Sequence, residues 1–224
     1  MKRATHILIL FVLAVVFLPA HAQNFSNPSL VLQSVDVSPN EFNKVSRDAT
    51  ITELDHTHAG SWQITIENKL LYANPSGSAV VRFYDANTPG KFIEVGMDSP
   101  SDRRLWVGLE LPDEGYFSVT HVDMDGWSDS TKVILAYNDD QGVSISNGKR
   151  VVVTNLDLRG FAVNAYSVYG MEESTDPPAI NSGTFTFEVL SGDVSKNPFH
   201  FFPFYVSGAA AALVGVLLLI KKRS

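Results

Sequence analysis

The chain has 224 residues, of which 45% are hydrophobic and 18% charged; it contains no cysteine, and its formal net charge is −7. This composition excludes a disordered tail and a disulfide-stabilised miniprotein, and it suffices for one or two globular domains. Five of the 17 basic residues lie at the two ends, so the middle has 12 basic against 24 acidic residues. Such a segment lacks the clustered Lys and Arg that nucleic-acid binding needs.

Residues 1–22 have the three-part layout of a secretory signal peptide. Two basic residues precede an apolar run at 7–18, and Ala20 and Ala22 then form a small-x-small cleavage site. The run has 12 residues, fewer than the ~20 of a membrane-spanning helix, so we expect cleavage before Gln23. Asn24 opens the sequence's acceptable N-glycosylation motif, which applies if the organism is eukaryotic.

Between residues 24 and 198 the dominant hydrophobic period is two, which is typical of half-buried strands. Trp62, Ile64 and Ile66, for example, alternate with polar residues. We predict strands at 30–37, 62–70, 79–85, 92–97, 105–111, 115–122, 132–137, 143–146, 149–154, 161–166 and 184–189. Turn-forming residues separate these segments, and the sequence before residue 198 predicts no long helix. The fold class expected is all-β: an antiparallel β-sandwich, immunoglobulin-like or jelly-roll-like.

The clearest local unit surrounds Asn147-Gly148. Strand-like residues flank this pair on both sides, and Asn-Gly accepts the positive φ angles of a two-residue type I′ turn. We therefore predict a tight hairpin here.

Domain organisation is less constrained than fold class. We favour one extracytoplasmic domain over residues 23–190, with a polar loop at 170–183 before the last strand and a stalk at 191–200. The alternative is an immunoglobulin-like unit that ends near Asp123, followed by a smaller sheet. The second piece, of ~60 residues, would have a marginal core of its own.

Residues 201–220 carry no charge and are rich in Ala, Val and Leu. At ~1.5 Å per residue, 20 helical residues span roughly 30 Å, the thickness of a bilayer core. The tail 221–224 is basic, which places it in the cytoplasm and predicts a single-pass type I membrane protein. Lys221 and Lys222 either act as positive-inside flanking charges or resemble a dilysine signal for retrieval to the endoplasmic reticulum; the expected location is the cell surface or, in the second case, the reticulum lumen.

Ser207, Ala211 and Gly215 recur every four residues in this span. A stripe of small residues permits close helix packing in a membrane, and the alternative is a simple anchor.

Three carboxylates lie close together at a predicted turn, Asp123, Asp125 and Asp129. Calcium binds several such oxygens at one point, although Trp127 occupies the fifth position of the run, where an EF-hand would place a ligand. A hairpin turn explains the same residues, so no cofactor is expected unless Ca²⁺ binds here.

His56 and His58 point the same way if their segment is extended, and His121 is a candidate third ligand for a transition metal. By simple alternation His121 shares the face of Phe117 and Val119, so a core histidine is the other interpretation.

Trp106 falls on the polar face of its predicted strand, and Trp127 falls in a turn. Exposed aromatic rings on a sandwich stack on sugars or pack on partner proteins, and packing within the domain is the alternative.

No motif for nucleophilic, metal-assisted or phosphate chemistry is present, so we expect no enzyme. The first hypothesis is a membrane-anchored sandwich that binds another protein, as a surface domain or an accessory subunit of a membrane complex. The alternative is a carbohydrate- or calcium-dependent ligand-binding module that uses Trp106 and Trp127. Calcium-dependent or sugar-dependent thermal stabilisation distinguishes the two.

Overall fold

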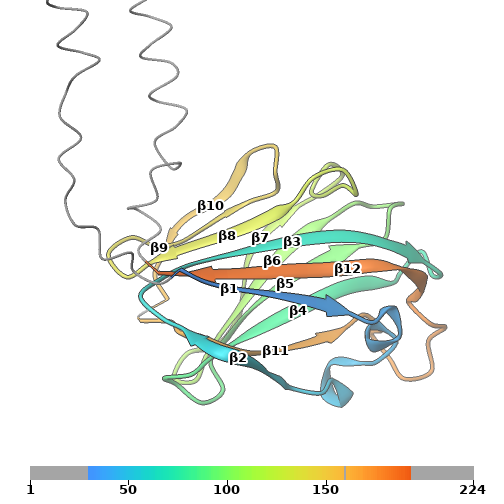
Figure 1. The fold of residues 1–224 in the computed structure, drawn as a ribbon. Coiled ribbons are helices and arrows are strands. Elements are labelled where there is room, and N and C mark those ends of the chain that lie inside the picture. The colour runs from blue at the N-terminus through green and yellow to red at the C-terminus, as the bar shows by residue number, and fades with distance from the viewer. Residues whose placement is uncertain (1–29, 159, 193–224) are drawn as a thin grey trace, which may run out of the picture.

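The computed structural model describes residues 30–158 and 160–192 as two antiparallel β-sheets packed face to face (Figure 1). The first sheet has the order β1-β12-β3-β8-β9-β10, and the second has the order β2-β11-β4-β5-β6-β7. The predicted all-β antiparallel sandwich is confirmed. The strands are β1 (Val31–Val37), β2 (Thr52–His58), β3 (Ser61–Tyr72), β4 (Ser78–Asp85), β5 (Phe92–Asp98), β6 (Leu105–Leu111), β7 (Gly115–Val122), β8 (Val133–Asn138), β9 (Gly142–Ser146), β10 (Val151–Leu156), β11 (Val163–Tyr169) and β12 (Ile180–Ser191).

The two ends of the described chain are interleaved. β12 lies between β1 and β3 in one sheet, and β11 lies between β2 and β4 in the other. Both sheets therefore combine strands from before and after Asp123. Twelve strands nested in this way form a jelly-roll-like sandwich, whereas immunoglobulin domains have seven to nine strands.

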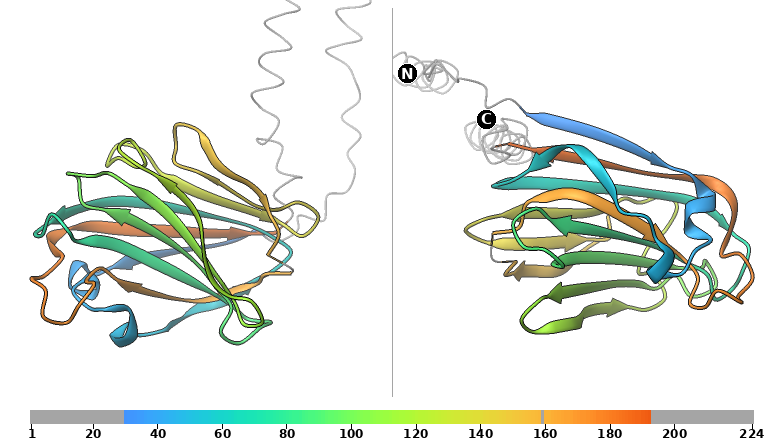
Figure 2. Two further views of the ribbon diagram at one scale, coloured as in Figure 1. Left: turned by 180° about the vertical axis from the view of Figure 1, so that it is seen from behind. Right: turned by 90° about the horizontal axis from the view of Figure 1, so that it is seen from below.

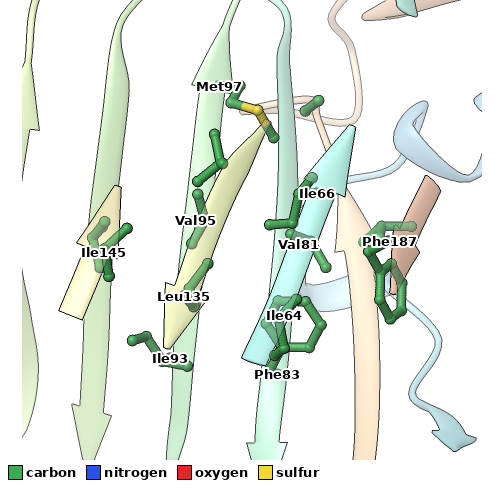
Figure 3. Packing of buried hydrophobic residues seen from close by; sticks show 14 of the residues in the cluster. Ile64, Ile66, Val81, Phe83, Ile93, Val95, Met97, Leu135, Ile145 and Phe187 are labelled. Carbon is green, nitrogen blue, oxygen red and sulfur yellow. The ribbon is translucent and has the colours of Figure 1, made fainter. Parts of the chain in front are cut away.

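The core lies between the sheets, as alternation along the strands requires. Ile64 and Ile66 of β3 and Phe187 of β12 face Val81 and Phe83 of β4, and all five are buried (Figure 3). At about 25 cal/mol for each Å² of apolar surface removed from water, burial of this kind is the dominant force that holds two sheets together.

The N-terminal and C-terminal ends of the described chain lie at the same end of the sandwich, because Val31 pairs with Ser191 (Figure 2). At the other end β12 begins beside Tyr72, the last residue of β3. Twelve strand residues at about 3.3 Å each separate the two ends by roughly 40 Å. We call them the terminal end and the distal end.

Two short 3-10 helices, η1 (Pro39–Phe42) and η2 (Ser46–Asp48), connect β1 to β2 at the distal end (Figure 1). Asn43 fixes this connection, because its side chain accepts from Ile180 N at 2.8 Å and donates to Ile180 O at 2.9 Å. Phe42 is fully buried, with its ring centroid 4.8 Å from that of Phe185.

Three local predictions need correction. β2 was not predicted as a strand, because it is an edge strand with only Leu54 and His58 buried and so shows weak alternation. The loop predicted at 170–183 ends earlier, since β12 begins at Ile180. The turn after β9 has four residues rather than two, because Val151 pairs with Ser146 and Asn147 accepts from the backbone N–H groups of Lys149 and Arg150.

Several predictions concern residues outside the described ranges: the signal peptide 1–22, the glycosylation motif at Asn24, the span 201–220 with its stripe Ser207, Ala211 and Gly215, and the basic tail. They stay predictions. Within residues 30–158 and 160–192, the structure has no helix with the length and apolar character to span a bilayer.

Candidate functional site

A pocket of about 700 Å³ lies on the outer face of the second sheet, toward its distal end. Residues of β4, β5, β6, β7 and β11 form its floor, and the loops after β3, β5 and β11 surround it. Its volume is within the range of small-molecule sites, ~300–1,000 Å³. Its lining combines three aromatic rings with charged and hydroxyl groups: Trp106, Tyr116, Tyr169, Asp98, Asp102, Arg104, His121, Glu172, Ser46, Ser76, Ser78 and Ser118.

Two strand glycines determine how two of the rings lie. Gly96 pairs directly with Trp106, and a Cβ on Gly96 would come within 2.0 Å of the indole. A Cβ on Gly108 would likewise come within 2.1 Å of the Tyr116 hydroxyl oxygen. Glycine in a strand interior is unfavourable unless something approaches closely, and here the approaching groups are aromatic rings. Trp106 and Tyr116 therefore lie over bare backbone, and Tyr116 remains 50% exposed.

Asp98 organises the wall beside the indole. Its Oδ1 accepts hydrogen bonds from Ser78 Oγ at 2.9 Å and from Trp106 Nε1 at 3.1 Å. Arg104 Nη1 lies 3.7 Å from Asp98 Oδ2, while Arg104 Nε donates to Asp123 at 2.8 Å. The hydrogen bond to Asp123 and the charge of Asp98 raise the pKa of Arg104. These contacts orient the indole and leave a carboxylate, a guanidinium and a ring edge side by side.

A charged network supports the floor. Arg82 Nη2 lies 2.8 Å from Glu94 Oε2, and Tyr169 donates to the same oxygen at 2.9 Å. The Glu94 side chain is only 3% exposed, and the Arg82 guanidinium lies 4.0 Å from the Phe92 ring centroid. Burial and the Glu94 charge raise the pKa of Tyr169, so its hydroxyl stays protonated. Buried charges of this kind are stable only when paired, so the network makes the floor rigid.

His121 belongs to this face, which corrects the alternation argument. The register between β6 and β7 shifts between Val107 and Gly108, because Val119 is an extra residue in β7. His121 therefore pairs with Trp106 and points into the pocket, 2.6 Å from Ser118 Oγ. A β-bulge reverses the face of every residue beyond it, and strict period-two counting misses this.

The predicted histidine metal site does not form. β2 carries His56 and His58 at one edge of the second sheet, and β7 carries His121 at the other. His58 is fully buried, with Nδ1 2.8 Å from Ser191 Oγ. Its Nε2 has no hydrogen-bond partner in the part of the chain that the structure describes. Among the residues that the structure describes, no three His, Asp or Glu side chains are placed to hold a metal ion.

The free energy of unfolding is expected to fall as the pH is lowered through the range in which His58 binds a proton in the unfolded chain. Burial and nearby His56 lower the pKa of His58 from its ordinary 6.5. The unfolded chain therefore binds a proton at His58 more readily than the folded chain does. Neutral His58 contributes its full share to the free energy of unfolding above pH 6.5, and this share decreases as the pH falls below 6.5. Urea unfolding between pH 7.5 and 5.5 measures the slope, which His58→Gln should reduce. An equal slope in wild type and His58→Gln contradicts this assignment.

The aspartate run does not converge on a calcium site either. Asp123 pairs with Arg104, and Asp125 lies 3.6 Å from Lys149 on the other side of the turn. Asp129 instead lines a separate hollow of about 380 Å³. The turn interpretation explains this segment better.

Trp127 is a core residue, so packing within the domain is the correct interpretation of it and the ligand-binding one is wrong. It is only 4% exposed, its Nε1 donates to Asp98 O at 2.8 Å, and its ring centroid lies 5.8 Å from that of Tyr72. The connection from β7 to β8 thus buries its tryptophan against the ends of β3 and β5, which the local sequence does not show.

Sequence reasoning thus located Trp106 on the correct face but missed Asp98, Arg104, Tyr116 and the Arg82–Glu94 pair. A usable signal was present: Gly96 and Gly108 both interrupt apolar strands at outward-facing positions.

No protein-family model matches the chain, and no curated protein matches it. Among solved structures, the fold is similar to a fructofuranosidase from Schwanniomyces occidentalis complexed with fructose, with a TM-score of 0.48 and 12% identity over 73% of this chain and 35% of that one. It is also similar to the carbohydrate-binding module CBM66 from Bacillus subtilis (TM-score 0.39, 9% identity, 73% and 92% covered) and to the Emp47p carbohydrate recognition domain (0.42, 11%, 72% and 88%). The chain thus spans about a third of the length of the fructofuranosidase.

Proposed function

We propose that this protein is a non-catalytic carbohydrate-binding β-sandwich and that the pocket on the second sheet is its sugar site. The observation that carries the proposal is the pair of rings laid over Gly96 and Gly108 beside the Asp98 carboxylate. A sugar ring offers an apolar C–H face and a rim of hydroxyl groups. Aromatic faces suit the first, and carboxylate and guanidinium groups suit the second.

The composition of the exposed surface supports a sugar over a protein partner. Apart from Leu30 and Leu32, which both lie at the start of β1, the large exposed hydrophobic residues of the described chain are on separate elements: Ile51, Leu71, Tyr116, Met124 and Val151. A stable protein interface needs ≈1,200 Å² or more, whereas this site is a concave pocket in which charged and hydroxyl-bearing residues surround three aromatic rings. The first hypothesis, a protein partner, stays a prediction.

The position of the pocket fits the topology expected from the sequence. If residues 201–220 anchor the chain, the terminal end faces the membrane and the pocket lies toward the other end of the sandwich, up to roughly 40 Å away. We propose an extracytoplasmic site directed away from its own membrane. A non-catalytic role predicts that bound oligosaccharides are recovered uncleaved.

Trp106→Ala should lower glycan affinity at least tenfold, because it removes a stacking face and the hydrogen bond to Asp98. The test uses the full chain in a detergent without a sugar headgroup, first on a glycan array and then by calorimetry with the retained glycan. Leu32→Ala is the control, since Leu32 is 63% exposed on the first sheet, away from the pocket. Failure of the wild type to retain any glycan, or unchanged binding by Trp106→Ala, contradicts the proposal.

A further inference from the structure

We infer that the site is a groove for a glycan chain of three or more sugar units rather than a pocket for one sugar; this inference rests on the proposed function. The pocket adjoins a second hollow of about 420 Å³, and Ser46 and Glu172 line both. The second hollow is completed by Val45, Arg47, Glu173 and Ser174.

The backbone fixes the boundary between the two hollows. Val45 and Met171 form a parallel bridge, and the N–H groups of Gly170 and Met171 both donate to Lys44 O, at 3.1 and 3.0 Å. A Cβ on Gly170 would lie 2.1 Å from Ser78 O and 2.7 Å from Phe42 O, so only glycine permits the chain at residue 170 to lie this close to both. The two segments that carry Ser46 and Glu172 are therefore held together before any ligand binds, which lowers the entropy cost of binding.

The two hollows differ in chemistry. The first contains the rings of Trp106 and Tyr116, whereas the second has no aromatic residue in its lining. There Arg47 Nη2 donates to Ser174 Oγ at 3.2 Å beside the Glu173 carboxylate. A stacking position followed by a charged, hydroxyl-lined position suits successive units of one chain: one unit lies against the rings and the next ones present hydroxyl groups.

Ser46 connects the two positions. Its Oγ accepts a hydrogen bond from Arg82 Nη2 at 3.1 Å, and Arg82 is itself fixed by Glu94. The Ser46 hydroxyl proton is thus directed away from Arg82 and can be donated to a ligand oxygen. A chain that leaves the rings meets this donor before it reaches Arg47.

A chain-length series tests the inference. The probes are cello-, laminari-, manno-, xylo- and chito-oligosaccharides of two to six units, titrated calorimetrically into the full-length protein in a detergent without a sugar headgroup. For the series that binds, Kd should fall at least tenfold between the disaccharide and the tetrasaccharide and then level off. Arg47→Ala should remove most of that gain and leave the disaccharide Kd unchanged. Arg150→Ala, an exposed arginine in the β9–β10 turn, should change neither value.

The outcomes separate the two proposals. Equal affinity for disaccharide and hexasaccharide overturns the groove and leaves the sugar site intact. A length-dependent gain that survives Arg47→Ala also overturns it, because the chain then extends in another direction. Absence of binding by all five series overturns this inference for these chains, and the proposed function falls with it only if the wild type also retains no glycan on the array.

Discussion

Replacement of Lys91 by methionine is expected to lower the free energy of unfolding by about 3–5 kcal/mol, because it leaves the buried Asp85 carboxylate without its countercharge. Lys91 Nζ lies 3.2 Å from Asp85 Oδ2, and the two side chains are 4% and 0% exposed. Among the described residues, Asp85 Oδ2 has no hydrogen-bond partner beyond this ionic contact with Lys91.

The pair also holds a loop in place. Lys91 donates to Leu158 O, and Asp85 Oδ1 accepts from Ala162 N at 2.9 Å. The residues between them include Phe161, which is buried and accepts a hydrogen bond from Trp62 Nε1 at 3.0 Å. Loss of the pair should therefore loosen the segment before β11 as well as cost electrostatic energy.

Chemical unfolding of the wild type, Lys91→Met, Asp85→Asn and the double variant measures the effect. Each single variant leaves one charge buried, whereas the double variant leaves none and should recover part of the stability. Lys149→Met is the control, because the Lys149–Asp125 pair is exposed and should matter by no more than about 1 kcal/mol. A single variant as stable as the control would show that the buried pair does not stabilise the fold.

Substitution of Gly96 by valine should abolish most glycan binding, with a loss of about a hundredfold, or ~2.7 kcal/mol. The new Cβ would stand 2.0 Å from the Trp106 indole, so the ring must move. The displaced indole loses its hydrogen bond to Asp98 and turns into the space that a ligand would occupy. Overpacking at this position should also cost ~1–3 kcal/mol of stability.

A double variant isolates this steric cause. In Gly96→Val combined with Trp106→Ala the collision partner is gone, so thermal stability should return toward the wild-type value while binding stays weak. If Gly96→Val alone binds like the wild type in the array and calorimetry assays, then the orientation of Trp106 does not matter for recognition.

The sequence by itself determined the fold class and one residue of the site. Apolar residues two apart, as in Leu105, Val107 and Leu109, can be buried together only in a strand, and this places Trp106 on the opposite face. Because alternation is a local property, such statements need no knowledge of the partner strand.

Only the tertiary structure decided which residues share the site. Asp98 ends one strand and Trp106 lies in the next, and their hydrogen bond depends on the register between β5 and β6. An extra residue in β7 turned His121 into the pocket, and the connection from β7 to β8 buried Trp127 against Tyr72 and Asp98. Register, bulges and loop packing depend on contacts between segments far apart in the chain. The period of a single strand carries no information about them, so a sequence read strand by strand predicts the sandwich but not its binding site.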